Sequence, residues 1–178
     1  MAWNTPKTWL AENVLTAAEL NQQIRDNLLE TEVAKATQAG QLMVSAGNHE
    51  VAMRTPVQDD NSATVTTSST TPTTLGGGTP SVTYEQGGGV IILFAARMRD
   101  TQGTGYINCG PEIVGVSGAE ASVSRAIRHQ SNPWVRYSGH VLHYDMEPGV
   151  QTARLMYWCN SSNSTGEFAF RTITVIPL

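Results

Sequence analysis

The hydrophobic residues are spaced differently in residues 1–39 and in the rest of the chain. Leu20, Ile24 and Leu28 recur at every fourth position, with polar residues around them. This spacing places the three side chains on one face of an α-helix. From residue 62 onward, short runs rich in β-branched and aromatic residues are separated by clusters of Gly, Pro, Asn and Ser. That pattern is typical of β-strands joined by turns.

The predicted helix has a clear beginning. Thr16 and Glu19 match a capping box, in which each side chain binds the backbone N–H of the other residue. Leu15 and Leu20 flank the cap as a hydrophobic staple. A helix of roughly four turns with one narrow apolar stripe is not stable alone in water. The stripe must therefore pack against another protein, against copies of itself or against the β-domain, and we favour an intermolecular contact.

These patterns predict a mainly β protein: a jelly-roll-like antiparallel β-sandwich preceded by a short N-terminal helix and a linker. The helical segment covers residues 1–39, the linker 40–61 and the β-sandwich 62–178. One or two polar strands are expected in the Ser- and Thr-rich stretch 62–74. Further strands are expected near residues 81–85, 90–99, 105–108, 112–116, 121–129, 134–144, 151–158 and 168–176.

The last predicted strand, 168–176, has apolar residues on both faces. Phe168, Phe170 and Ile176 alternate onto one face, and further apolar residues occupy the other. A sandwich buries one face of such a strand, so the second face needs a partner. The low charge of the chain and Asn27 near the seam of the helix also favour a closed oligomer. We predict a homotrimer, with a dimer as the next alternative.

The charge of the chain excludes several partners. Charged residues make up only 15% of the sequence, and the formal net charge is −4. No basic run is present, so direct binding of nucleic acid is not expected. The longest apolar run, residues 90–96, is too short to span a membrane, and the opening residues lack the pattern of a secretory signal. We expect assembly in a host cytoplasm, where Cys109 and Cys159 are predicted to be buried free thiols, with a disulfide as the alternative.

No arrangement of residues typical of an enzyme stands out. His140 and His143 are three positions apart in a predicted strand, so they point to opposite faces and cannot share a metal ion. The acidic residues Glu112, Asp145 and Glu147 lie beside Gly-Pro or Pro-Gly turns, where carboxylates usually face solvent. Sequence motifs for nucleotide binding or a catalytic serine are not present. We therefore predict a non-enzymatic protein with no catalytic residues, no metal and no cofactor.

Five aromatic residues fall in two strands that we expect to be neighbours. Aromatic side chains are common in cores and subunit interfaces, and exposed aromatic rings can also stack on sugars. We interpret the group as core or interface, with a receptor site as the alternative. The five residues are Trp134, Tyr137, Tyr144, Tyr157 and Trp158.

Both ends of the chain resemble virion proteins of tailed phages. The chain opens with Trp3-Asn4-Thr5-Pro6-Lys7-Thr8-Trp9, continues with V-L-T-A-A-E-L-N at 14–21 and I-R-D-N-L at 24–28, and ends with R-T-I-T-V-I-P-L at 171–178. This opening is similar to a pattern in small virion proteins of tailed phages, notably phages of actinobacteria: W-x-T-P-x-T-W, then V-L-T-A-A-x-L-N and R-D-N-L. The ending is similar to that of the same proteins, which are described as minor tail, tail fibre, head fibre or capsid decoration proteins.

The resemblance implies a trimeric particle component that docks through its N-terminus and points its β-domain outward. The residues expected to dock or oligomerise are Trp3, Trp9, Leu15, Leu20, Ile24 and Leu28. Because the chain is short and has no long coiled coil to form a shaft, we favour a homotrimeric capsid decoration or head-fibre protein on the virion surface. Its expected partners are its own copies and the major capsid protein or tail proteins of the same virion. The alternative is a minor tail or tail-fibre protein whose β-domain binds a host surface glycan.

Overall fold

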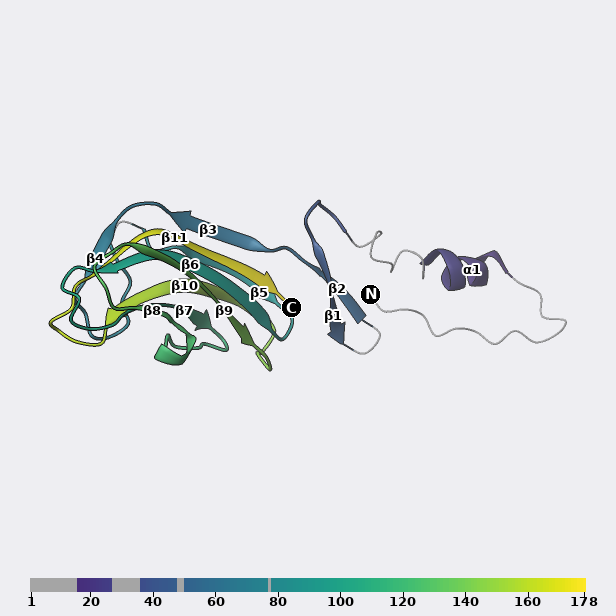
Figure 1. The fold of residues 1–178 in the computed structure, drawn as a ribbon. Coiled ribbons are helices and arrows are strands. Elements are labelled where there is room, and N and C mark those ends of the chain that lie inside the picture. The colour runs from purple at the N-terminus through teal and green to yellow at the C-terminus, as the bar shows by residue number, and fades with distance from the viewer. Residues whose placement is uncertain (1–15, 27–35, 48–49, 77) are drawn as a thin grey trace. The chain divides into compact units, whose positions relative to one another are not determined.

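The computed structural model describes residues 16–26, 36–47, 50–76 and 78–178 (Figure 1). It divides the chain into two units, Met1–Thr55 and Pro56–Leu178. The second unit therefore begins six residues before the start that the composition predicted, at residue 62. Residues 56–61, assigned above to the linker, belong to it because the strand within them pairs with the last strand of the chain.

The first unit contains a short helical segment and a hairpin. Helix α1 (Ala17–Leu20) continues into η1 (Asn21–Asp26). The predicted capping box is confirmed: the Glu19 amide donates to Thr16 Oγ1 at 3.2 Å, and the Thr16 amide donates to Glu19 Oε2 at 3.1 Å. The predicted end of the helix, between residues 30 and 35, lies outside the described residues. Strands β1 (Leu42–Gly47) and β2 (Glu50–Arg54) pair as an antiparallel hairpin within the expected linker.

The second unit is a sandwich of two antiparallel sheets (Figure 1). The four-stranded sheet has the order β5-β10-β7-β8, and the five-stranded sheet has the order β3-β11-β6-β9, with β4 beside one end of β11. The bounds of the first sheet are β5 (Ser81–Gln86), β10 (Gly149–Cys159), β7 (Ile107–Gly115) and β8 (Ile127–His129). Those of the second are β3 (Val57–Asn61), β11 (Gly166–Pro177), β6 (Val90–Asp100), β9 (Val135–His143) and β4 (Val65–Thr67).

The order of the strands defines a jelly roll. Leaving out the short β4, the chain alternates between the two sheets at every connection except the one from β7 to β8, which stay in the same sheet. Eight strands wound in this way form two four-stranded layers that close over one core. The fold class that the sequence predicted, a mainly β, jelly-roll-like sandwich with a short helix near its N-terminus, is thus confirmed.

The core lies between the two sheets and follows the period-two alternation of the strands. In β6 every second side chain from Val90 to Asp100 is buried, and β5 shows the same alternation. Side chains that point between the sheets lose most of their contact with water, which is the main source of stability in such a fold. The fully buried members of this core include Val90, Ile92, Met98, Ile107, Leu155, Tyr157, Phe168, Ile173 and Val175.

Two strand predictions need correction, and a third, one or two strands in the stretch 62–74, is met by a single strand. A single strand, β7 (Ile107–Gly115), replaces the two expected in 105–116, because Gly110 and Pro111 pair with Met156 and Leu155 of β10 instead of forming a turn. Residues 121–129 contain only the short β8, preceded by the 3-10 turn η2 (Val123–Arg125). In the Ser- and Thr-rich stretch, only β4 forms a strand, and it extends the sheet beside β11.

A bulge in β11 changes the faces that the alternation predicted. The register with β6 shifts between Ala169 and Thr172. Phe168 is fully buried, whereas Phe170 is 50% exposed and has a φ of 47°. Phe168 and Phe170 therefore do not share a face. After the bulge, Arg171 joins the buried side, because the extra residue reverses the alternation for the rest of the strand.

Candidate functional site

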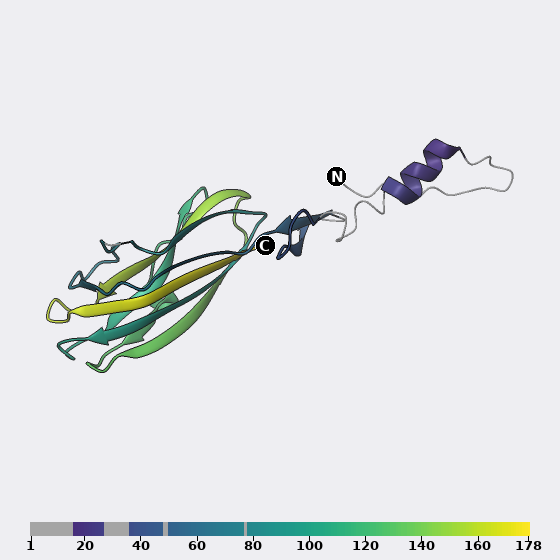
Figure 2. The same cartoon turned by 90° about the horizontal axis from the view of Figure 1, so that it is seen from above.

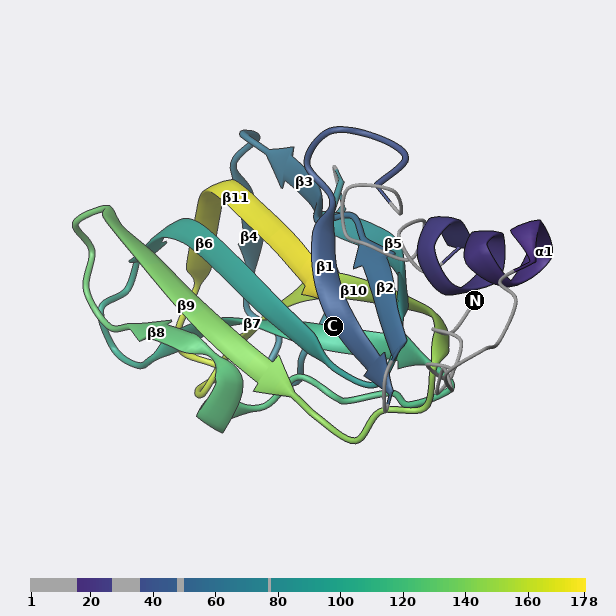
Figure 3. The same cartoon turned by 90° about the vertical axis from the view of Figure 1, so that its right-hand side faces the viewer.

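The outer face of the five-stranded sheet, which points away from the core, carries a groove. Strands β11, β6 and β9 lie side by side in this sheet (Figure 3), and β11, coloured yellow, runs through its middle when the sandwich is seen from above (Figure 2). A hollow of about 380 Å³ lies on this face. It is lined by Leu93, Phe94, Ala95, Arg136, Ser138, Gly139, His140, Thr172 and Thr174.

The hollow follows from the size of the side chains in successive rows across the strands. One row consists of Asp60, Thr172, Ala95 and Ser138, which are paired from strand to strand. These are small side chains apart from Asp60 at the edge. The rows on either side contain larger ones, with Leu93 opposite His140 and Arg97 opposite Arg136. A row of short side chains between two rows of longer ones leaves a trough across the sheet.

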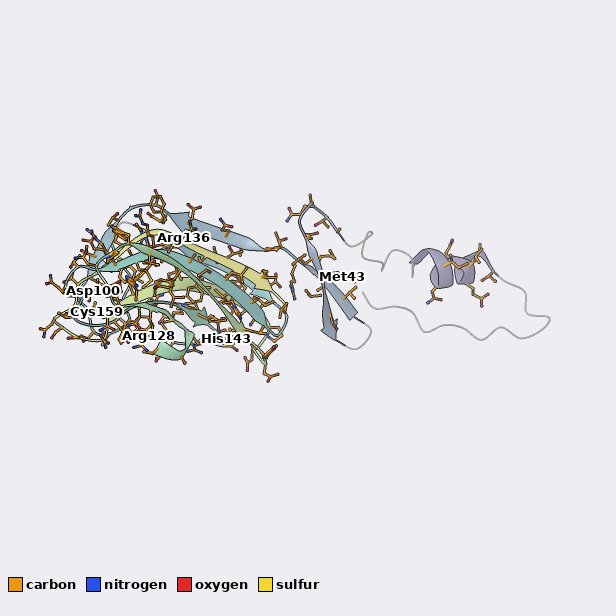
Figure 4. All side chains as sticks on the ribbon, viewed as in Figure 1. Met43, Asp100, Arg128, Arg136, His143 and Cys159 are labelled. Atoms are coloured by element: carbon orange, nitrogen blue, oxygen red, sulfur yellow. The ribbon has the colours of Figure 1, made fainter. Side chains whose placement is uncertain are left out.

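A second, smaller hollow adjoins the first. It has a volume of about 190 Å³ and is lined by Asp60, Ser62, Arg136, Phe170, Arg171 and Thr172. Arg136 and Thr172 line both hollows, and we call the two hollows together the outer groove. Figure 4 labels Arg136 on this side of the sandwich and Arg128 on the opposite side. Hydroxyl, carboxylate, guanidinium and imidazole groups thus line the outer groove.

The arginines at one end of the outer groove are unusual in their pairing. Arg97 and Arg136 stand directly opposite each other in the β6–β9 register. Like charges in such positions destabilise a sheet. Among the described residues, neither arginine has a carboxylate within ion-pair distance, whereas Arg99 Nε lies 2.6 Å from Glu167 Oε2. The Trp134 ring partly offsets the repulsion, because the guanidinium carbon of Arg97 lies 5.1 Å from its centroid.

Phe170 lies where the sequence did not indicate a functional residue. Its backbone is in the left-handed region, which costs a residue other than glycine about 1–2 kcal/mol. Its ring is half exposed and lines the smaller hollow. Strained residues and bulges are common beside binding sites. The apolar residues change from even positions, Phe168 and Phe170, to odd positions, Ile173 and Val175, a signal for the bulge that the sequence analysis did not use. Asp60 and Ser62 were missed as well.

The residues predicted to dock or oligomerise lie in the first unit. Trp3, Trp9, Leu15 and Leu28 lie outside the described residues. Leu20 and Ile24 are described, and their exposed fractions are 47% and 52%. Two hairpin residues, Leu42 and Met43 (labelled in Figure 4), are exposed to a similar extent. The described part of the first unit therefore presents several apolar side chains to solvent.

The five aromatic residues are not brought together. The two strands that carry them, β9 and β10, belong to different sheets and are not neighbours. Tyr157 is buried in the core against Phe168, with ring centroids 4.9 Å apart, and Trp158 is buried as well. Trp134 contacts the arginines of β6, and the Tyr137 hydroxyl lies 3.1 Å from His129 Nδ1. Tyr144 is exposed beyond the end of β9.

The acidic residues have structural roles. Glu112 accepts a 2.6 Å hydrogen bond from Arg154 Nε on the neighbouring strand. Asp145 and Glu147 are exposed in the turn after β9. The buried Asp100 accepts hydrogen bonds from the backbone amides of Gln102, Gly105 and Thr165, and so ties two loops together. Within the described ranges, no group of three or more metal-ligating side chains is found.

Burial dominates the titration of the core groups. It raises the pKa of the Cys109 thiol well above its usual range, an effect that the charge of Arg171 partly offsets. Burial also raises the pKa of Cys159, and it raises the pKa of Tyr84 to about 12. Both cysteines are free and buried, as the sequence predicted. Because a thiol reacts as its thiolate, these two cysteines are inert at neutral pH in the folded protein.

The pKa of His143, at the end of β9, is lowered from its usual value. Burial is the main cause, and the charge of Arg125 adds to it. The neutral imidazole is therefore the stable form above neutral pH.

None of the described helices is long and apolar enough to cross a membrane.

Comparison with known proteins finds similarity at the level of the fold. No family model and no curated protein matches the sequence. Among solved structures, a chain of the infectious bursal disease virus Gt strain aligns with 74% of this chain at 8% identity and a TM-score of 0.42. This chain spans only 36% of that viral chain.

Two carbohydrate-binding modules align over a larger share of their own length. TmCBM61, solved in complex with β-1,4-galactotriose, aligns with 80% of this chain and 85% of its own at 11% identity and a TM-score of 0.35. The xylan-binding domain CBM22-1 of Paenibacillus barcinonensis Xyn10C aligns with 80% of this chain and 99% of its own at 9% identity and a TM-score of 0.34. All these similarities are distant, so no ligand or partner is transferred from them to this chain.

Proposed function

We propose that this chain is a non-enzymatic structural protein of the surface of a tailed-phage particle, a homotrimeric capsid decoration or head-fibre protein. It docks through its N-terminal unit and displays the jelly roll outward. The observation that carries the proposal is the contrast between the two units. The jelly roll has a core of its own, whereas no residue of the first unit whose burial is described is fully buried, and its elements need a partner.

Neither described element of the first unit is stable by itself. An isolated helical segment of this length is marginal in water, and so is a two-stranded hairpin. Leu20 and Ile24 lie on one side of the helical segment, and Leu42 and Met43 are exposed on the hairpin. Burying them against the major capsid protein, tail proteins or copies of the same chain removes this apolar surface from water. The resemblance of residues 3–28 to virion proteins points to the same role.

The docking proposal can be tested with charged substitutions in the helical segment. Leu20→Asp combined with Ile24→Asp should abolish co-sedimentation with particles that lack the wild-type protein, because burying an unpaired carboxylate costs several kcal/mol. The matched control, Asn21→Asp with Gln22→Asp, introduces the same charge on exposed positions beside the stripe. The control should co-sediment like the wild type. Normal co-sedimentation of the Leu20/Ile24 variant would reject the docking role.

A second candidate function is favoured by the outer groove. A minor tail or tail-fibre protein that binds a host surface glycan needs an exposed depression with a few polar groups placed to bind sugar hydroxyls. The outer groove provides hydroxyls from Ser138, Thr172 and Thr174 on a face of the displayed unit. The two candidates differ in the position on the particle, which cryo-electron microscopy of the intact virion would establish.

A further inference from the structure

We infer that the outer groove binds a neutral pyranose residue of a glycan, with the ring of Phe170 as its stacking platform. This inference rests on the proposed outward display of the jelly roll, and it deepens the second candidate function by naming the ligand class and the residues. Its starting point is the bulge in β11, which turns the Phe170 ring out of the core.

The bulge presents a core-type residue to solvent. Without it, residue 170 would follow Phe168 at a spacing of two and would point into the core. With it, the Phe170 ring is half exposed, and its backbone has a φ of 47°. A bulge of this kind redirects a side chain. The redirected ring lines the smaller hollow, next to Asp60 and Arg136.

The groups around the smaller hollow match the two kinds of surface on a pyranose. The ring of such a sugar has an apolar face of C–H groups, which packs on an aromatic ring. Its rim of hydroxyls both donates and accepts hydrogen bonds. Asp60 can accept from two hydroxyls, and the fork of Arg136 can donate to two neighbouring ones. Ser62 and Thr172 add hydroxyls that do either.

The charges favour a neutral sugar. The two exposed charged side chains of the smaller hollow, Asp60 and Arg136, have opposite charges, and the third charged residue that lines it, Arg171, is fully buried. An acidic ligand would meet the carboxylate of Asp60, and a cationic one would meet the guanidinium of Arg136. Both side chains are exposed, and neither has an ion-pair partner among the described residues, which leaves their polar atoms available to a ligand.

The larger hollow extends the site beyond one sugar. The small side chains of Ala95 and Ser138 form its floor, and His140 and Thr174 stand along its far side. Arg136 and Thr172 belong to both hollows and so would contact two successive residues of a glycan. The volumes, about 190 Å³ and about 380 Å³, accommodate a short oligosaccharide lying across β11, β6 and β9.

The test is saturation-transfer difference NMR on the full chain. The probes are the methyl pyranosides of D-glucose, D-galactose and D-mannose, with D-glucuronic acid and N-acetylneuraminic acid as acidic probes. At least one methyl pyranoside should receive saturation at its ring C–H protons. Phe170→Ala should weaken that binding at least tenfold, and Arg136→Ala and Asp60→Asn should weaken it as well, whereas Phe170→Trp should retain it.

The control variant is Tyr144→Ala, which removes an aromatic ring that is 67% exposed but does not line the groove. It should bind like the wild type, and circular dichroism should show every variant to be folded. Three results would overturn the inference: no transfer to any of the three pyranosides, transfer to the acidic probes alone, or full binding by Phe170→Ala.

Co-sedimentation with particles separates this inference from the docking proposal. Phe170→Ala should still attach to particles, since it leaves the N-terminal unit unchanged. The Leu20/Ile24 double variant should still bind the pyranoside, because the groove lies in the other unit. If the groove variants bind sugar normally while docking variants fail to attach, the inference fails and the docking proposal stands. If instead the docking variants attach normally while the groove variants lose sugar binding, the docking proposal fails and this inference stands.

Discussion

Phe170 and Arg171 are adjacent in the bulge of β11 but have opposite environments. Phe170 is exposed, whereas Arg171 is fully buried. Arg171 Nη2 donates to the Ala63 carbonyl at 3.2 Å, and its guanidinium carbon lies 5.7 Å from the centroid of the Tyr157 ring. Its Nε and Nη1 have no hydrogen-bond partner among the described residues. A buried guanidinium with unpaired donors is costly, so the bulge places both residues in environments that their residue types disfavour.

The opposite environments of Phe168 and Phe170 give a stability prediction. Phe168→Ala should lower the free energy of unfolding by about 3–5 kcal/mol, because it empties a fully buried position. Phe170→Ala should change it by less than about 1 kcal/mol, as for a surface residue. Urea unfolding of both variants measures the difference. Equal losses would mean that the two rings share the core face, as the simple alternation predicts.

At the scale of elements, the pairing of β6 with β9 supports the outer groove. Gly139 of β9 is paired with Phe94 of β6. A Cβ at Gly139 would lie 2.8 Å from Phe94 Cζ and 3.0 Å from Ile127 Cγ2, which is too close for atoms that cannot move freely. The absence of a side chain at 139 lets the Phe94 ring pack under β9. The glycine thus leaves room for the Phe94 ring on the core side of the strand that carries Ser138 and His140.

Adding a side chain at 139 should destabilise the protein. Gly139→Val should cost about 1–3 kcal/mol through overpacking, as measured by chemical denaturation. Ser138→Val, its neighbour on the outward face, should change stability by no more than about 0.5 kcal/mol.

Combining Gly139→Val with Phe94→Leu should recover part of the loss, because the smaller side chain makes room for the valine. If the double variant is as unstable as the sum of the two single ones, the clash with Phe94 is not the cause.

At the scale of the whole molecule, the sandwich leaves apolar surface on its other outer face. Val114 of β7 and Val150 of β10 are 45% and 62% exposed. They lie diagonally across neighbouring strands, since Val114 is paired with Thr152. Exposed apolar patches of this kind favour contact with another subunit. The sequence analysis argued for a trimer partly from apolar residues on both faces of β11. Because the bulge changes which of these residues face outward, the trimer prediction no longer depends on that face of β11.

The mass of the protein in solution tests the oligomeric state. Size exclusion coupled to light scattering should give close to three times 19.2 kDa. Val114→Asp with Val150→Asp should shift the mass toward that of a monomer, because the added charges cannot be buried at an interface without a partner. A monomer mass for the wild type, together with single copies away from any three-fold axis in a particle map, would reject the trimer.

Local patterns in the sequence determined the features that depend on neighbouring residues. The Thr16–Glu19 capping box was predictable because both partners lie within one helical turn. The alternation in β5 and β6 was predictable because every second residue faces the core. The free, buried state of Cys109 and Cys159 was predicted from the expected reducing compartment. The mainly β class resulted from the sum of such local preferences.

Only the tertiary structure decided which strands are neighbours and where the alternation is interrupted. The pairing of β3 with β11, more than a hundred residues apart, brought Asp60 and Ser62 beside Phe170 and Arg136. The bulge in β11 reversed the faces of every residue that follows it. Both effects arise from long-range register, in which a shift of one residue exchanges the buried and exposed faces. The apolar residues of β11 change phase at the bulge, but only the pairing with β6 fixes where the shift falls.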